Sequence, residues 1–297
     1  MVPNLPRQSR PGARLLGARS RWLGQALGGT AAGLIAWLGI ISHSPTLRAA
    51  DLPARKHSTV IIAHRGEHLR HQENTLPAIQ GAIDAGADFT EMDVRRSRDG
   101  EYLLMHDATV DRMTDGHGKV ADLNWSELSK LVVQDRRLTN VPPSRIPLFR
   151  EALPECRGRI HIYLDFKAGD RKSVADLVHA AGMELQVIVY DSAKGLAEWS
   201  TVAPNLALIT SPPRNAAKSK SVLADFVNHF HPQVLDEASD AAFVANAVAL
   251  GVLVWPDIQR HDEEPAYWQS IWDRGVRGFQ TDHPAELAQW LEKEGRR

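Results

Sequence analysis

Ionisable residues follow three short apolar stretches in the first half of this chain. His64 and Arg65 come directly after the first stretch, Glu91 and Asp93 lie at the end of the second, and His106 follows the third. Ionisable side chains at the carboxyl ends of apolar strands are typical of the mouth of a barrel enzyme. This set of residue types suits one task, which is to hold a divalent metal and a phosphate between two groups that transfer protons.

The carboxylates have a spacing that favours a shared metal site. Glu91 and Asp93 should point to the same face, because side chains alternate along a strand, and Asp165 and Lys167 repeat this spacing after another apolar run. One such pair alone could equally be an exposed strand end or a structural salt bridge. Several pairs at the ends of successive strands would repel one another without a cation. We therefore expect Glu91, Asp93 and Asp165 to hold one divalent cation, Ca²⁺ or Mg²⁺.

Two histidines are the candidate catalytic residues. The imidazoles of His64 and His106 titrate near neutrality, so each can accept or donate a proton within one reaction cycle. Arg65 can bind a phosphate through two parallel hydrogen bonds, and Lys167 offers a point charge. Trp255 ends an apolar stretch and is expected to line the substrate pocket at the mouth.

The N-terminal part differs in composition from the rest. All six charged residues before position 51 are arginines, so residues 51–297 carry a net charge of −7, against −1 for the whole chain. This acidic remainder argues against a broad nucleic-acid surface. Five arginines precede an apolar segment at 22–41, which predicts a signal peptide or a membrane anchor. We assign residues 1–55 to this leader and its linker, and expect a protein exported to the periplasm or the extracellular space, or associated with the membrane through residues 22–41.

Strand-like and helical patterns alternate from residue 56 to residue 297. This alternation predicts parallel βαβ units in one α/β domain, a (β/α)8 TIM barrel of the usual length of about 250 residues, although a doubly wound open sheet has the same periodicity. There is one more candidate strand than a barrel needs, and Gln233–Asp236 is the weakest of them. The candidates are 60–63, 89–94, 102–106, 161–166, 185–190, 206–210, 233–236, 252–255 and 278–280.

Several connecting segments carry their own signals. Asn74 is expected to cap the helix that follows it, and residues 126–132 have a helical pattern. Residues 107–124 are rich in Asp, Gly and Thr, and we expect them to form a loop over the site. Asp282 precedes the last predicted helix, 284–293, and either lines the mouth or caps that helix.

The motifs and their order resemble those of the glycerophosphodiester phosphodiesterase family. The resemblance covers roughly residues 58–290. It implies a barrel of the phospholipase-C-like phosphodiesterase type, one bound divalent cation, and hydrolysis of a small-molecule glycerophosphodiester to sn-glycerol 3-phosphate and an alcohol. The residues that carry it most clearly are His64-Arg65-Gly66, Glu73-Asn74-Thr75, Glu91-Met92-Asp93-Val94, His106-Asp107, Asp165-Phe166-Lys167 and Thr281-Asp282-His283-Pro284.

The resemblance also implies roles for individual residues. It places the acid–base pair on His64 and His106, the phosphate contacts on Arg65 and Lys167, and the metal ligands on the three carboxylates named above. In the family, the 2-hydroxyl of the glycerol is the attacking group, and water then opens the resulting cyclic phosphate.

Three positions depart from the family pattern. Asp165 stands where glutamate is usual and is shorter by one methylene, which bears on metal affinity and metal choice. Gln72 replaces a proline, from which we expect little effect. Pro256-Asp257-Ile258 replaces Thr-x-Asn after Trp255, and because this change lies at the expected mouth, substrate preference could differ.

Other functions are compatible with parts of this pattern. A related barrel phosphodiesterase that acts on intact phospholipid, similar to sphingomyelinase D, would accommodate Asp165. A non-catalytic, envelope-anchored binding protein would be expected to lack several of the catalytic residue types, which are all present here. Metal-dependent amidohydrolases generally need a His-x-His pair on one strand, and none of the predicted strands contains one.

Overall fold

The computed structural model describes residues 51–297 with the exception of 136, 137, 139 and 261. The predicted apolar segment 22–41 lies outside these residues, so its assignment as a signal peptide or anchor stays a prediction. Within the described part, no helix is both long enough and apolar enough to cross a bilayer.

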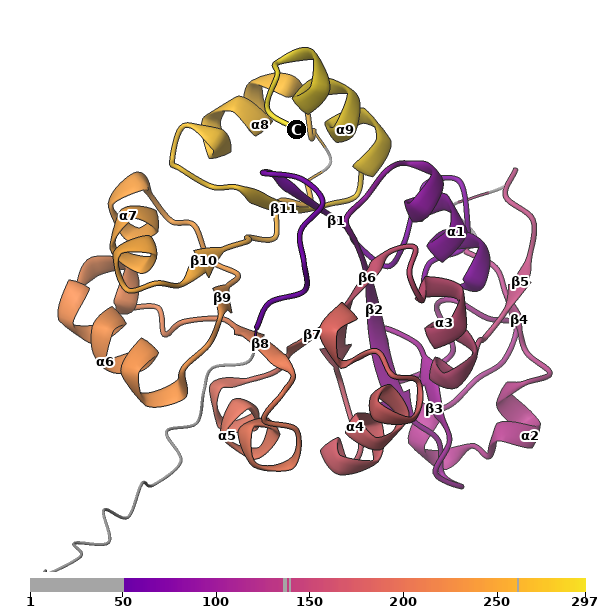
Figure 1. Ribbon diagram of the computed structural model, residues 1–297. Helices are drawn as coiled ribbons and strands as arrows, with labels where there is room; N and C mark the ends of the chain where they lie inside the picture. Colours follow the sequence, from indigo (N-terminus) through magenta and orange to yellow (C-terminus); the bar gives the residue numbers. More distant parts are fainter. Residues whose placement is uncertain (1–50, 136–137, 139, 261) are drawn as a thin grey trace, which may run out of the picture. The chain divides into compact units, whose positions relative to one another are not determined.

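Eight parallel strands form the predicted barrel (Figure 1). They pair in the order β10-β9-β8-β7-β6-β2-β1-β11. The ring comes together where Asp257, just beyond β10, pairs in parallel with Gln280 of β11. The barrel strands are β1 (Val60–Ala63), β2 (Phe89–Arg96), β6 (His161–Phe166), β7 (Val187–Tyr190), β8 (Ala207–Thr210), β9 (Val234–Leu235), β10 (Leu253–Val254) and β11 (Gly278–Thr281).

Helices surround this ring of strands in Figure 1. They follow the barrel strands along the chain, as expected for βα units. The last helix has the bounds that the sequence predicts. The helices are α1 (Leu76–Asp84), α2 (Trp125–Leu128), α3 (Phe149–Cys156), α4 (Arg171–Ala180), α5 (Ala193–Val202), α6 (Lys220–Phe230), α7 (Ala241–Ala249), α8 (Pro265–Trp272) and α9 (Pro284–Lys293), with short 3₁₀ turns at Val120–Asp122, Glu184–Gln186 and Ala216–Lys218.

Alternation along the strands separates two apolar cores. In β1, Val60 and Ile62 point into the barrel, whereas Ile61 and Ala63 pack against the helices. Because the period is two, the next inward position after Ile62 is His64, at the carboxyl end of the strand. The same rule brings the polar residues that follow the other strands to one rim. The inner core consists of Val60, Ile62, Phe89, Tyr163, Ile188, Ala207, Ile209, Val234 and Trp255.

The candidate strand that lies outside the barrel is not the one we expected. Gln233–Asp236, the weakest candidate, contains β9 and belongs to the barrel. The strand outside the ring is β3 (Tyr102–Leu104), which pairs antiparallel with β2. Only five residues separate β2 from β3, and a parallel connection needs a dozen or more, so these two strands can only form a hairpin.

The segment beyond β3 forms a small apolar cluster beside the barrel. Residues 107–124, expected to form a loop over the site, contribute Val110, Met113 and Val120 to this cluster. The helix expected at 126–132 is shorter, because after α2 the chain enters β4 (Val132–Val133), which pairs with β5 (Ser144–Arg145).

Gln72 anchors this segment to the loop after β1. Its side-chain oxygen accepts a hydrogen bond from the backbone of Asp135 at 2.7 Å, and its amide donates to the carbonyls of Val141 and Pro142. The side chain is buried. The replacement of proline by Gln72, from which we expected little effect, therefore supplies a structural contact.

Candidate active site

Three carboxylates meet at the carboxyl ends of neighbouring strands. Glu91 and Asp93 extend from β2, and Asp165 of β6 is the register partner of Asp93. One oxygen of each lies within 4.8 Å of those of the other two. Glu91 and Asp93 are almost fully buried. Side chains this close are within reach of one metal ion.

The charges of this carboxylate group are poorly compensated. Burial, followed by repulsion from Asp93 and Asp165, holds the pKa of Glu91 well above its usual range. Burial also raises the pKa of Asp165, although Lys167 opposes this. For Asp93, burial acts in the same sense, but Lys167, His106 and Arg65 outweigh it and lower the pKa. A buried set of hard oxygen ligands with excess negative charge fits a divalent cation such as Ca²⁺ or Mg²⁺.

Lys167 lies against two of these carboxylates. Its Nζ is 2.6 Å from Oδ2 of Asp165 and 3.1 Å from Oδ1 of Asp93. Burial alone would lower the pKa of Lys167, but the two aspartates reverse this and raise it. The ammonium group is therefore charged and in place beside the carboxylates, at the rim where a phosphate would approach them.

Arg65 is held between the carboxylates and the loop that follows β1. Its backbone N–H donates to Oε2 of Glu91 at 2.6 Å, and its φ of +53° is in the left-handed region. Its guanidinium contacts both oxygens of Glu73 at 3.1 and 3.2 Å. Its Nε is buried without a hydrogen-bond partner, with Oδ2 of Asp93 3.7 Å away. A buried donor of this kind is costly unless a further group accepts from it, and the Asp93 carboxylate is near enough to do so after a small shift.

Asn74 positions Asp93 and does not cap a helix as expected. Its side-chain nitrogen donates to Oδ2 of Asp93 at 2.6 Å, and its side-chain oxygen accepts from the backbone N–H of Asp93 at 3.0 Å. The N-cap of α1 is the next residue, Thr75. An Asn that bonds a distant strand cannot also face its own helix, which is why the local capping rule failed here.

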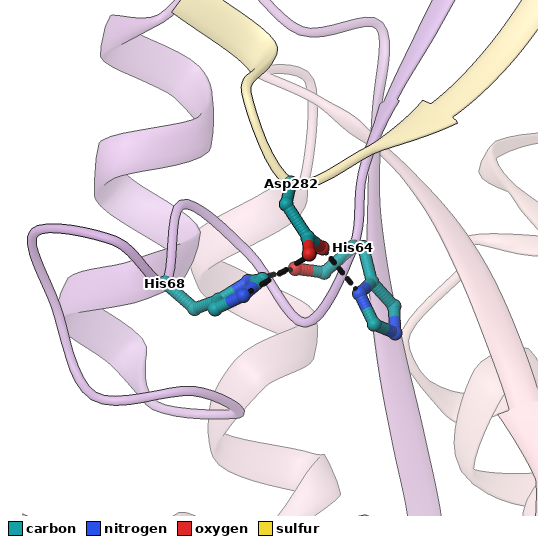
Figure 2. A group of neighbouring side chains, drawn as sticks. All are labelled: His64, His68 and Asp282. Carbon is teal, nitrogen blue, oxygen red and sulfur yellow. Dashed lines mark hydrogen bonds and ion pairs between the residues drawn. The ribbon is translucent and has the colours of Figure 1, made fainter. Parts of the chain in front are cut away.

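His64 is oriented by Asp282, the residue that follows β11 (Figure 2). The Nδ1 of His64 and Oδ1 of Asp282 are 2.7 Å apart. His68 lies on the other side of Asp282, and its ring bonds the backbone carbonyl of His64 at 2.8 Å. Burial lowers the pKa of His64, with Asp282 acting in the opposite direction. A neutral imidazole held at Nδ1 by a carboxylate presents Nε2 as a proton acceptor.

Asp282 thus takes one of the two roles considered for it. It bonds His64 at the mouth, while His283 stands at the N-cap of α9. His64, His68 and Asp282 are close enough to hold a metal ion. However, one nitrogen of each ring already has a hydrogen-bond partner, so this group serves better to orient His64.

His106 reaches the site by a different route from the one we expected. It follows β3, so it does not end a barrel strand; the antiparallel β3 returns along β2 until the backbone N–H of Met105 bonds the carbonyl of Asp93. Arg95 donates twice to the carbonyl of His106, at 2.6 and 3.0 Å. The ring Nδ1 lies 2.7 Å from Oδ1 of Asp107.

A chain of ion pairs joins the two histidine regions. Arg112, from the segment beyond β3, contacts Asp107 at 2.6 Å and Glu73 at 2.7 Å, and Glu73 also contacts Arg65. Burial would raise the pKa of Glu73, but Arg112 and Arg65 outweigh it and lower the pKa. Arg112 was not among the predicted site residues, because no local spacing connects it to residues 73 or 107.

Trp255 lies in a different place from the one we expected. Its side chain is 1% exposed and packs in the inner core, with its ring 5.3 Å from that of Phe89. A Cβ on Gly278 would overlap the Trp255 ring, so this glycine makes room for it. The side chain turns inward and down from the end of β10, and the expected position at the mouth is wrong.

Comparison with known proteins identifies relatives of the chain. The pattern of the glycerophosphoryl diester phosphodiesterase family matches residues 64–286. Mouse glycerophosphodiester phosphodiesterase 1 is 40% identical over 140 residues, which is 46% of this chain and 41% of the mouse protein. The matched region therefore spans less than half the length of that relative.

Solved structures share the fold over most of the chain. A glycerophosphodiester phosphodiesterase from Agrobacterium tumefaciens is 26% identical, with a TM-score of 0.67 over 77% of this chain and 99% of that one. A phosphodiesterase from Oleispira antarctica, in complex with the product sn-glycerol-3-phosphate, is 20% identical, with a TM-score of 0.65 over 78% of this chain and 96% of that one.

Proposed function

This chain belongs to the glycerophosphoryl diester phosphodiesterase family, and we propose that it hydrolyses glycerophosphodiesters to sn-glycerol 3-phosphate and an alcohol. One observation carries the proposal. The oxygens of Glu91, Asp93 and Asp165 lie within 4.8 Å of one another, beside two histidines that each bond an aspartate. The product in the Oleispira phosphodiesterase, which shares the fold, supports the same product here.

The three carboxylates would hold the cation, and Arg65 and Lys167 would bind phosphate oxygens. A divalent cation bound by this group supplies a Lewis acid that offsets the negative charge developing on the phosphoryl group. The position of the Arg65 guanidinium beside Asp93 supports its part in phosphate binding. Lys167, which follows β6, supplies a second positive charge.

His64 is assigned as the first base. Burial lowers its pKa, so it is neutral near pH 7 and can accept the proton of the attacking 2-hydroxyl of the glycerol. That oxygen bonds phosphorus, and the bond from phosphorus to the alcohol oxygen breaks. His106, at the more exposed side of the site, donates a proton to the departing alcohol. Water then opens the cyclic phosphate with the two roles reversed.

Product analysis with matched variants tests this function. Wild-type protein is assayed on glycerophosphocholine, glycerophosphoethanolamine, glycerophosphoglycerol and sphingomyelin, with Ca²⁺, Mg²⁺ or EDTA. We expect sn-glycerol 3-phosphate from the three glycerol esters only and loss of turnover in EDTA. His64→Ala and His106→Ala should each lower kcat by about 10²–10⁴-fold. His117→Ala, which changes an exposed histidine, is the control.

Two results would contradict the scheme. Activity within tenfold of wild type in either histidine variant would exclude the two-histidine chemistry. Turnover that survives EDTA would exclude the need for a cation. Ca²⁺ or Mg²⁺ binding that calorimetry finds equal in Glu91→Gln and in wild type would exclude Glu91 as a metal ligand.

We also propose that the N-terminal segment directs export or attaches the protein to the membrane. The support is the five arginines, without any acidic residue, that precede the apolar segment 22–41. Export would bring the barrel to extracellular or periplasmic glycerophosphodiesters. N-terminal sequencing of the native protein, together with membrane fractionation, tests this. A native N-terminus at Met1 in a fraction free of membranes would refute it.

A further inference from the structure

The half of the mouth opposite the catalytic groups has polar residues that the proposed chemistry does not use. They follow four successive strands: Tyr190 ends β7, Ser211 follows β8, Asp236 follows β9 and Asp257 lies just beyond β10. Each is at an inward position, two residues beyond an inward core residue. For example, Ile188 and Ile209 belong to the inner core, and Tyr190 and Ser211 follow them. These four residues and Gln280 are called the distal half.

Hydrogen bonds join three members of the distal half. Tyr190 Oη and Ser211 Oγ are 2.8 Å apart, and Ser211 Oγ donates to Oδ2 of Asp236 at 2.9 Å. The ring of Tyr190 also stacks on Tyr163, with centroids 6.1 Å apart. The hydroxyl groups of Tyr190 and Ser211 therefore already donate hydrogen bonds within this row, and the Ser211 hydroxyl fixes the position of the Asp236 carboxylate.

The two aspartates of the distal half have no positive partner. Among residues 51–297, with the exceptions given above, neither Asp236 nor Asp257 forms an ion pair. Lys167, the lysine on the catalytic side of the mouth, already forms ion pairs with Asp93 and Asp165. Asp257 is exposed to water at the mouth, but the barrel atoms around its carboxyl group remove part of its hydration. This desolvation, followed by repulsion from Asp236, raises its pKa to about 7, although a hydrogen bond from the Gln259 side chain opposes the shift.

Gln280 provides an independent sign that this half of the mouth can bind a ligand. Its Oε1 is buried without a hydrogen-bond partner, and the residue is only 5% exposed. Gln280 is the register partner of Asp257, so the two side chains lie on the same inward face. It stands on β11 between Gly278, which faces the Trp255 ring, and Asp282, which bonds His64. A buried acceptor beside an unpaired carboxylate calls for a donor.

We propose that the distal half binds the alcohol portion of the substrate, and that it selects an alcohol with a primary ammonium group, as in glycerophosphoethanolamine. The groups that await a partner are two carboxylates without a cation and an amide oxygen without a donor, all of them acceptors. A primary ammonium carries a positive charge and three N–H donors, so it satisfies both the charge and the acceptors. A quaternary ammonium has the charge without donors, and a neutral polyol has donors without the charge.

The replacement of Thr-x-Asn by Pro256-Asp257-Ile258 fits this specificity. Asp257 supplies a carboxylate, while Ile258 is turned into the core between the strands and the helices. The inference rests on the proposed phosphodiesterase activity, and it adds the class of alcohol that the enzyme releases.

Competition between esters tests the distal half. We compare kcat/KM for glycerophosphoethanolamine, glycerophosphocholine and glycerophosphoglycerol in wild type, Asp257→Asn and Asp236→Asn. Wild type should prefer the ethanolamine ester by about tenfold or more over the glycerol ester, the value of one charge-assisted contact. Each variant should lower this ratio by about tenfold, mainly through KM. Asp262→Asn, an exposed aspartate paired with Arg260, should leave the ratio and the activity unchanged.

The outcomes distinguish failure of the ammonium site from failure of the phosphodiesterase activity. Hydrolysis of all three esters within threefold of one another, or a wild-type preference for the choline ester, overturns the distal half as an ammonium site and leaves the phosphodiesterase intact. An equal loss on every ester in both aspartate variants shows a structural role and also overturns it. No hydrolysis of any ester removes the proposed function and this inference with it.

Discussion

Asp282→Asn offers the sharpest test of how the site works. The carboxylate of Asp282 lies 2.7 Å from Nδ1 of His64 and holds a proton on that nitrogen. An asparagine keeps the size of the side chain, but its amide can donate to Nδ1, which leaves the proton on Nε2. His64 would then offer no lone pair to the attacking hydroxyl.

The size of the effect follows from this contact. A hydrogen bond to a charged group contributes about 1.5–3 kcal/mol, which corresponds to roughly 10- to 200-fold in rate. Loss of the correct tautomer adds to this, up to the whole contribution of a general base, about 10²–10⁴-fold. We therefore expect kcat/KM of Asp282→Asn to fall by about 10²-fold or more.

The pH profile gives a second readout that a loss of stability would not produce. Burial lowers the pKa of His64 and Asp282 acts against this. Removal of the carboxylate should lower the pKa further. If His64 must be neutral to act as the base, the acidic limb of kcat/KM should move to lower pH, even as the plateau falls.

Steady-state kinetics between pH 4 and 9, about 2.5 units either side of the free histidine pKa, measure both effects. Asp262→Asn is the matched control, because Asp262 lies in the loop before α8 and its exposed side chain pairs with Arg260. Circular dichroism checks that each variant is folded. A plateau within threefold of wild type, or an acidic limb that moves to higher pH, would refute the assignment of His64 as a base oriented by Asp282.

Three other substitutions address the supporting contacts. Arg112→Ala should lower the free energy of unfolding by about 1–3 kcal/mol, because the buried Glu73 loses a partner at 2.7 Å, and should also lower kcat/KM by about tenfold. Urea unfolding and steady-state kinetics measure these two effects, and unchanged values in both would contradict the prediction. Gly66→Ala should cost about 2–4 kcal/mol in urea unfolding, because the residue has a φ of +78° and a Cβ would lie 2.7 Å from Ala78; a loss below about 0.5 kcal/mol would refute the clash. Trp255→Ala should cost roughly 3–5 kcal/mol as a core substitution while the order of preference among the three glycerol esters stays the same, and a changed order would return this side chain to the substrate site.

The carboxylate group was predictable because it depends only on two general rules. Side chains alternate along a strand, and the carboxyl ends of parallel strands lie together. These rules bring Glu91, Asp93 and Asp165 to one rim, with His64 on the next strand. The same alternation predicts that Trp255 points into the barrel, but it does not by itself place the residue at the mouth. Trp255 lies below the rim, where Gly278 has no side chain and leaves room for the ring.

The remaining contacts depend on distant parts of the chain. Five residues between β2 and β3 dictate a hairpin, so the antiparallel route of His106 could have been read from the sequence. Arg112 could not, because its partners Glu73 and Asp107 are joined to it only by the folding of the segment beyond β3. Asn74 shows the same limit, since a local cap signal lost to a bond with Asp93 on another strand.

The geometry also explains why an aspartate suffices at position 165, where glutamate is usual in the family. Asp93 and Asp165 are register partners, so their short side chains start at the same level of the barrel. Glu91 starts two residues lower on β2, and its side chain is longer by one methylene, which covers part of this offset. Oxygens of all three side chains lie within 4.8 Å of one another with aspartate at position 165. On this reasoning the exchange Asp165→Glu would crowd Lys167, whose Nζ already lies 2.6 Å from the carboxylate, and would not draw the three ligands closer together.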